Sequence, residues 1–384
     1  MAKTLTISVI KADVGGFVGH SDVHPEMRAE AIRLVRDATR RGLLIDAHVD
    51  ACGDDINLTM THEHGVDSEA VHEFAWNTFL ALSDIAKRLH LYGAGQDLLA
   101  DSFSGNVRGA GPGVAEMEIH ERPSEPFIVF AADKTEPGAW NFPLYKIFCD
   151  PFNTAGLVID TKMHDGFVVE VHDLIEHRRI LFHCPADLYD LLAYIGTPSR
   201  YVIKHVFRAA DLEEPVAVTS TSRLSLIAGR YVGKDDPVMI VRSQSGLPAV
   251  GEVLEPFAQP HIVAGWMRGS HNGPLMPCAV DQSQPARFDG PPRVVGMGFQ
   301  LADGKLIGPR DLLGDVSFDR ARAIALELAD HFRRMGPFEP GRLPHEAMEY
   351  TTLPEVEDRV SARWEPLAEE PAGRTPVPAG ANGP

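Results

Sequence analysis

The stretch "YVGKDDPVMI" (residues 231–240) places a tyrosine, a lysine and two aspartates together, and the lysine admits two interpretations. Ionised carboxylates raise the pKa of a nearby lysine, so Lys234 beside Asp235 and Asp236 could form an ordinary exposed ion pair. If the aspartates hold metal ions instead, the cations favour a neutral amine that can form a Schiff base with a carbonyl. Tyr231 is near enough in sequence to move a proton.

Further aspartates lie where predicted strands end. Asp13 ends "TLTISVIKAD", Asp133 ends the strand in "FIVFAADK", and Asp54 with Asp55 forms the turn of a predicted hairpin at "CGDD". Mg²⁺ prefers carboxylate oxygens together with water and substrate phosphate. Each aspartate could also simply form a turn, because Asp favours turns. Taken as a set, they indicate a candidate Mg²⁺ site.

Glycine-rich loops could complete this site. His20 and Gln96 lie in such loops and could add metal ligands, while "GAGQDLL", "SGN" and "GAGPG" could present backbone N–H groups to phosphate. These loops match neither the P-loop nor the dinucleotide fingerprint, so ordinary loops remain an alternative. Arg268 in "GWMRGSHNGPLMP" suits a phosphate or a surface turn. His62 and His64 in "THEHG" share a strand face, but no third zinc ligand follows at the usual spacing.

The composition of the chain restricts the classes of binding partner and the cellular compartment that we expect for this protein. The 384 residues carry a net charge of −18, which argues against nucleic acid and is compatible with bound cations. The four cysteines are scattered without a CxxC pair, as in reducing compartments. No segment has the continuous apolar character of a signal peptide or a membrane span. We therefore expect a cytoplasmic protein with no membrane partner.

Periodicity predicts a mixed α/β (α+β) domain. Its predicted strands include residues 4–13, 43–51, 56–64 and 127–133. Its predicted helices include residues 25–41, 68–90, 186–195 and 319–335. Asp-Gly pairs at 165–166 and 303–304 predict hairpin turns, so much of the sheet should be antiparallel, with helices on its outer faces. We predict one catalytic domain over residues 1–364 and a disordered Pro/Ala/Gly-rich tail over 365–384.

Six motifs in order resemble the bifunctional fructose-1,6-bisphosphate aldolase/phosphatase family, from about Thr4 to about Trp364. They are "SVIKADVGGFVGH", "CGDDINL", "YGAGQDLLADSFSGN", "AADKTEPGAWN", "YVGKDDPVMI" and "GWMRGSHNGPLMP". The resemblance implies an α-β-β-α sandwich, a homo-octamer and one site for two reactions. Dihydroxyacetone phosphate and glyceraldehyde 3-phosphate condense to fructose 1,6-bisphosphate, and the C1 phosphate is then hydrolysed to leave fructose 6-phosphate.

The resemblance also assigns residues. It implies that Lys234 forms the Schiff base, that Tyr231 moves the aldol proton, and that Asp13 activates water for hydrolysis. The implied Mg²⁺ ligands are Asp13, Asp54, Asp55, Gln96, Asp133, Asp235 and Asp236, and His20 is implied to touch metal or substrate. The implied sugar-phosphate contacts are Tyr92, Gly105, Asn106, Lys134, Gln244, Ser245, Arg268, Asp289 and Tyr350.

Two alternatives keep parts of the same site. A Mg²⁺-dependent sugar-bisphosphate phosphatase alone would use the metal ligands and leave Lys234 as an electrostatic clamp on phosphate. A non-catalytic sensor of sugar phosphates would need the metal and the ligand contacts only. Such a sensor needs no tyrosine–lysine pair beside metal ligands, and the density of these motifs therefore favours an enzyme.

Overall fold

The computed structural model describes residues 4–95, 98, 111–223, 236–348 and 352–365. Its contacts divide the chain into two compact units, Met1–Tyr350 and Thr351–Pro384. The first unit holds all the described sheets. The described part of the second unit contains the helix α9 (Leu353–Val360) and one turn of 3₁₀-helix. The predicted tail falls on residues outside the described part, so it stays a prediction.

A five-stranded antiparallel sheet, called the small sheet here, has β1 at its centre. Its order is β10 (Ser222–Arg223), β4 (Gly113–His120), β1 (Thr4–Asp13), β3 (Asp55–His62) and β2 (Asp46–Cys52). Alternation in β1 predicts a half-buried strand, but the structure buries both of its faces. Leu5, Ile7 and Val9 face one apolar cluster, whereas Ile10 and Ala12 face another.

A nine-stranded sheet, called the large sheet here, lies over the small one. Its order is β14 (Met276–Pro277), β15 (Arg293–Ala302), β5 (Glu125–Asp133), β11 (Val238–Arg242), β9 (Asp211–Thr219), β8 (Tyr201–Arg208), β6 (Phe167–Asp173) and β7 (Arg178–Cys184), with β16 (Lys305–Asp311) beside β15. Its strand pairs are antiparallel except β14–β15. A short hairpin of β12 (Ile262–Gly265) and β13 (His271–Pro274) stands apart.

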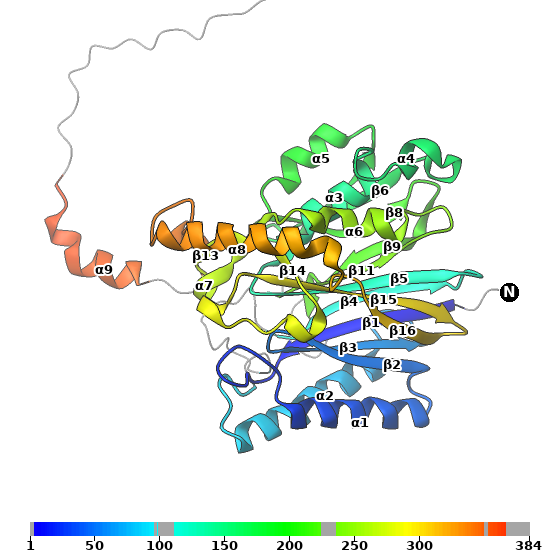
Figure 1. Ribbon diagram of the computed structural model, residues 1–384, viewed down its shortest axis with the longest axis horizontal. Coiled ribbons are helices and arrows are strands. Elements are labelled where there is room, and N and C mark those ends of the chain that lie inside the picture. Colours follow the sequence, from blue (N-terminus) through cyan, green and yellow to red (C-terminus); the bar gives the residue numbers. More distant parts are fainter. Residues whose placement is uncertain (1–3, 96–97, 99–110, 224–235, 349–351, 366–384) are drawn as a thin grey trace, which may run out of the picture. The chain divides into compact units, whose positions relative to one another are not determined.

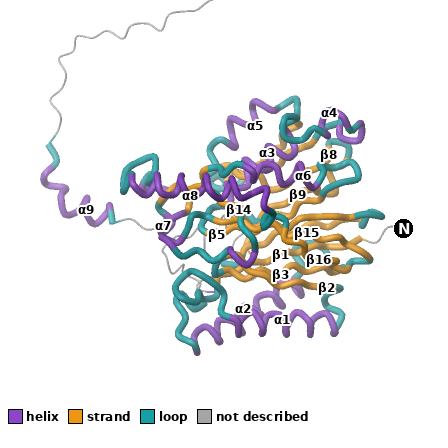
Figure 2. Tube along the Cα trace, viewed as in Figure 1, coloured by secondary structure: helices purple, strands orange, loops and turns teal. Residues whose placement is uncertain are grey.

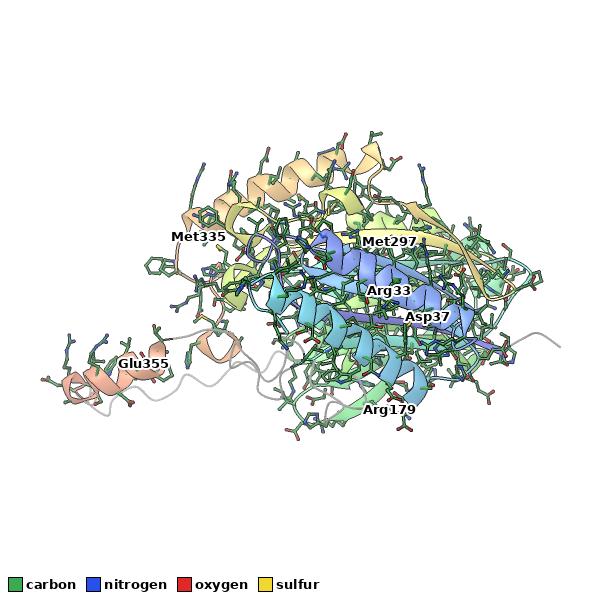
Figure 3. The ribbon with its side chains drawn as sticks, turned by 90° about the horizontal axis from the view of Figure 1, so that it is seen from below. Arg33, Asp37, Arg179, Met297, Met335 and Glu355 are labelled. Carbon is green, nitrogen blue, oxygen red and sulfur yellow. The ribbon has the colours of Figure 1, made fainter. Side chains whose placement is uncertain are left out.

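Helices cover the outer face of each sheet (Figures 1 and 2). The small sheet is covered by α1 (Pro25–Arg40) and α2 (Glu69–Arg88), which lie side by side in Figure 3. The large sheet is covered by α3 (Asn141–Cys149), α4 (Gly156–Ile159), α5 (Leu188–Ile195), α6 (Val250–Leu254) and α8 (Asp319–Arg334), and α7 (Trp266–Gly269) is a single turn after β12. Between the sheets, Val9 of β1 and Phe127 and Val129 of β5 share one apolar cluster. The order of layers is therefore α-β-β-α, which confirms the predicted mixed α/β fold with antiparallel sheets.

Some local predictions need correction. The Asp-Gly pair at 303–304 does join the antiparallel strands β15 and β16. The pair at 165–166 does not form a hairpin, because it connects a 3₁₀ turn to β6 and the Gly166 N–H bonds to Met163 O. Of the described helices, none combines the length and the apolar character that a bilayer span requires.

The outer helices should contribute to stability through their buried faces. Phe79 of α2 is fully buried, whereas the adjacent Leu80 is 39% exposed. We expect Phe79→Ala to lower the free energy of unfolding by about 3–5 kcal/mol, because it opens a cavity under the small sheet. The matched control Leu80→Ala should cost roughly 0.5 kcal/mol or less. Chemical denaturation followed by circular dichroism measures both, and equal losses would contradict the layer assignment.

Candidate active site

The predicted acidic residues converge where β1 and β5 end. Asp13 is the last residue of β1 and pairs with Asp55, the first residue of β3, because the two strands are antiparallel. Ligand atoms of Asp54, Asp55 and Asp133 lie within 4.8 Å of one another, and so do those of Asp13, His20 and Asp54. The hairpin turn is Gly53–Asp54 rather than Asp54–Asp55, since Asp55 already belongs to β3. Asp54 is thus shared by both groups.

Lys134 follows Asp133 and pairs with two of these carboxylates. Its Nζ lies 3.0 Å from Asp54 Oδ1 and 3.1 Å from Asp133 Oδ1. Burial by itself would lower the pKa of Lys134, but the charges of Asp133 and Asp54 outweigh burial and hold that pKa well above its usual value. Lys134 is therefore a permanently charged ammonium group, suited to binding phosphate.

His20 contacts the other side of Asp54. Its Nδ1 lies 2.7 Å from Asp54 Oδ2. Burial would raise the pKa of Asp54, but Lys134 and His20 together bring it below its usual range. The Tyr92 ring packs edge-on against His20 at 4.7 Å between centroids, and the Tyr92 carbonyl accepts the Gly16 N–H. The structure thus brings His20 and Tyr92 to the carboxylates.

Lys11 was missed by the sequence analysis. Its ammonium group is fully buried and donates to Asp55 Oδ2 at 2.6 Å and to the carbonyls of Ala132 and Asp236 at 2.7 Å. One signal could have revealed it: a lysine placed between Ile10 and Ala12 in a strand that leads directly to Asp13. A buried lysine requires a buried acceptor, so it indicates a carboxylate nearby.

The residues fit a divalent cation. Asp133 is fully buried, and within the described residues neither of its carboxylate oxygens accepts a hydrogen bond. Burial raises the pKa of Asp133 well above its usual value and Lys134 only partly opposes this, while Asp236 and Asp54 raise it further. Apart from the Lys134 ammonium group 3.1 Å from its Oδ1, the Asp133 carboxylate has no partner within the described residues, and a coordinated cation would add one and keep the carboxylate ionised. These hard oxygen donors match the preferences of Mg²⁺-like ions.

Asp236 is anchored beside Lys134. Its backbone N–H donates to Thr135 O at 2.6 Å, and its Oδ1 accepts the Thr135 N–H at 2.9 Å. Asp236, the first described residue after Lys234 and Asp235 in the sequence, therefore lies at the site. Seven predicted site residues lie outside the described residues and keep their status as predictions: Gln96, Gly105, Asn106, Tyr231, Lys234, Asp235 and Tyr350.

Several predicted residues share an unusual backbone conformation. Non-glycine residues rarely adopt positive φ, and such strain gathers at functional sites. Here Lys134, Asp236, Gln244, Ser245, Arg268 and Asp289 all have φ between 50° and 63°. The chain segment before Arg268 starts beside the site, because Thr135 Oγ1 donates to Ala264 O just before the turn that carries Arg268. Asp289 comes four residues before Arg293, which pairs with Asp133 in the sheet.

Gln244 and Ser245 lie at the other end of the large sheet. Arg122, just before β5 begins, donates to Gln244 O at 2.9 Å, and Arg208 donates to Ser245 O at 3.3 Å. Asp133 ends the same strand, so the nine residues of β5 separate Gln244 from the carboxylates by roughly 26 Å. Within one chain, the structure does not bring these two residues to the site.

The histidine pair of "THEHG" belongs to a separate polar network. His62 Nε2 lies 2.8 Å from Ser8 Oγ, and His62 Nδ1 accepts the His64 N–H at 3.3 Å. Burial lowers the pKa of His62 to about 4, so it is neutral at physiological pH. Ser8 donates in turn to Glu116. These hydrogen bonds are those of a polar strand face, which explains the two histidines without a zinc site.

Gly53 leaves the space that Asp133 occupies. Its φ is +61°, and a Cβ there would overlap the Asp133 carboxylate. We expect Gly53→Ala to weaken binding of divalent cations roughly 10- to 100-fold by displacing that ligand. Gly42→Ala is the matched control, because Gly42 has φ +78° and nothing within 4 Å of the added methyl. Titration calorimetry with Mg²⁺ or Mn²⁺ measures the difference, and unchanged binding by Gly53→Ala would contradict the expected displacement of Asp133.

Comparison with known proteins covers nearly the whole chain. A sequence model of the family described as fructose-1,6-bisphosphatase matches residues 4–365. A Moorella thermoacetica protein named fructose-1,6-bisphosphate aldolase/phosphatase is 62% identical over 379 residues, covering 96% of this chain and 99% of the relative. Proteins of the same name from Ignicoccus hospitalis and Methanothermobacter marburgensis are 60% and 57% identical, covering 97% and 94% of this chain and 95% and 99% of the relatives. The resemblance found in the motifs is thus confirmed, and the chain belongs to the fructose-1,6-bisphosphatase family.

Proposed function

We propose that this protein is a bifunctional enzyme of gluconeogenesis. It condenses dihydroxyacetone phosphate with glyceraldehyde 3-phosphate to fructose 1,6-bisphosphate, and it then hydrolyses the C1 phosphate to give fructose 6-phosphate. The observation that carries this proposal is the joint placement of Asp54, Asp133 and Lys134 in a chain that closely resembles proteins named for both activities. The scattered free cysteines support a reducing compartment, and we propose the cytoplasm.

The hydrolytic step uses the described residues. We propose Mg²⁺ as the ion held by Asp13, Asp54, Asp55, Asp133 and Asp236, and when bound it supplies charge neutralisation at the phosphate oxygens. The Lys134 ammonium group binds the same phosphate as a fixed positive charge. Asp13 accepts the Gly15 N–H at 2.9 Å through Oδ1, which fixes its carboxylate for taking a proton from the attacking water.

The aldol step requires an amine that can lose its proton. Lys134 does not meet this requirement, because two carboxylates within 3.1 Å keep it charged. The remaining candidate from the motifs is Lys234, two residues before the anchored Asp236, with Tyr231 to move the proton. A Schiff base on Lys234 would acidify C3 of dihydroxyacetone phosphate and allow it to attack the aldehyde.

Borohydride trapping distinguishes the two lysines. With dihydroxyacetone phosphate and borohydride, we expect a reduced adduct on the peptide that contains Lys234 and none on the peptide that contains Lys134. Lys234→Arg should abolish the adduct, whereas the matched variant Lys134→Arg should retain it. Mass spectrometry of the digested protein measures both.

Other outcomes of the trapping experiment select an alternative. Absence of an adduct with metal-dependent phosphate release intact would leave a phosphatase alone, with Lys234 as a clamp on phosphate. Absence of turnover in both the aldol reaction and the phosphate hydrolysis would leave a sensor. An adduct on Lys134 would contradict the charge assignment made from its carboxylate partners.

We further propose that the protein assembles as a homo-octamer in which one chain completes the site of another. Gln244 and Ser245 are implied substrate contacts, yet they lie about 26 Å from Asp133 along β5. A second copy could bring its own Gln244 to the carboxylates of the first. Both ends of β5 would then serve catalysis, in two different sites.

Mixed assemblies test this sharing of sites. Asp54→Asn and the double variant Gln244→Ala/Ser245→Ala should each be inactive alone. In each case every site lacks the residues that one of its two chains contributes. Co-expression should restore about a quarter of the phosphate release of the wild type, as random pairing of two kinds of chain predicts. The control pair Asp54→Asn with Asp133→Asn should restore nothing, since both changes affect the same half. No restoration in the first mixture would contradict sharing.

A further inference from the structure

The two loops that carry Arg268 and Asp289 each contain a strained dipeptide. Met267 and Arg268 have φ of 47° and 61°, and Phe288 and Asp289 have φ of 54° and 55°. Left-handed conformations at successive non-glycine residues persist only where the surrounding structure enforces them. In each dipeptide the first residue is apolar and the second is an implied substrate contact. The surroundings of the apolar residues therefore decide where Arg268 and Asp289 lie.

Trp266 joins the two loops. It is 1% exposed, and its Nε1 donates to Phe288 O at 2.9 Å. Two glycines make room for the indole, because a Cβ on Gly273 or Gly290 would overlap the ring. The indole thus packs against both loops and fixes the carbonyl directly before Asp289.

Arg333 of α8 contacts both loops from outside. Its guanidinium lies over the Phe288 ring, and its Nη1 lies 3.8 Å from Met267 Sδ. It therefore packs against the neighbour of Arg268 and the neighbour of Asp289 at the same time. An ion pair between Arg287 and Asp330 links the second loop to the same helix. Met335, labelled in Figure 3, lies directly after the end of α8 and shows where this helix ends.

We propose that Trp266 and Arg333 are positioning residues that hold Arg268 and Asp289 as one substrate-binding unit. This inference rests on the proposed function, because the sugar phosphate is what the unit would bind. Neither residue needs to touch substrate: Trp266 is buried and Arg333 acts through Met267 and Phe288. Loss of Arg333 frees both dipeptides to relax away from positive φ, and Arg268 and Asp289 then leave their binding geometry.

The kinetic signature is a change in KM. With Arg333→Met, the KM for fructose 1,6-bisphosphate in phosphate release should rise about five- to tenfold, the scale of one cation–π contact. The kcat should stay within roughly twofold, because the carboxylates and Lys134 are unaffected. Arg333→Lys should give an intermediate KM, since it keeps the charge without the planar group. Arg334→Met is the matched control, because Arg334 is the exposed neighbour on α8, and it should leave KM unchanged.

A double-mutant cycle separates positioning from general destabilisation. If Arg333 acts through Arg268, then Arg333→Met should raise KM little further in an Arg268→Lys background. An equal rise in both backgrounds, or an unchanged KM in Arg333→Met, would overturn the proposal. Trp266→Phe removes the donated N–H together with part of the buried ring, and it should show the same dependence. If that variant fails to fold, as thermal unfolding would show, the Arg333 series decides alone.

The wild type run in parallel separates the two levels of inference. Turnover of fructose 1,6-bisphosphate by the wild type with a normal KM in Arg333→Met refutes the positioning role and leaves the proposed function standing. Absence of turnover by the wild type refutes the proposed function, and the positioning role falls with it.

Discussion

The site depends on one buried ammonium group that joins the two sheets. Lys11 belongs to β1 of the small sheet, and it donates to Ala132 of β5 and to Asp236 beside β11, both of the large sheet. Its ion pair with Asp55 holds the start of β3 in the same place. A buried charge without these partners would be strongly destabilising, so the sheets must meet in this register at this end. The carboxylates are brought together as a consequence.

Charge balance then explains why these residues are suited to holding cations. Within the described residues, five carboxylates surround the ammonium groups of Lys11 and Lys134: those of Asp13, Asp54, Asp55, Asp133 and Asp236. Negative charge therefore exceeds positive charge in a region largely closed to water. Protonation of a carboxylate or binding of metal ions restores the balance. The chain's net charge of −18 is in part a property of this site.

The sequence predicted the ends of strands better than the contacts between them. Alternation correctly placed Asp13 and Asp133 at strand ends, because side-chain period reports burial along a single strand. The same alternation wrongly predicted that β1 is half-buried, since the pattern of one strand cannot show that a second sheet covers its other face. Lys11 was missed for the same reason, as its acceptors come from residues more than forty positions away. The motifs named Gln244 as a site residue, but only the course of β5 shows that it lies far from Asp133.

Strand β5 packs in the core and also connects two regions to which the proposed function assigns substrate or metal binding. One end of this strand carries Asp133 and Lys134, and the other end lies beside Gln244. If each end serves a different site, the length of β5 sets the distance between neighbouring catalytic centres. An inserted residue would also turn every side chain beyond it to the opposite face, because the strand period is two. In that case, an insertion or deletion within β5 would disturb both sites at once.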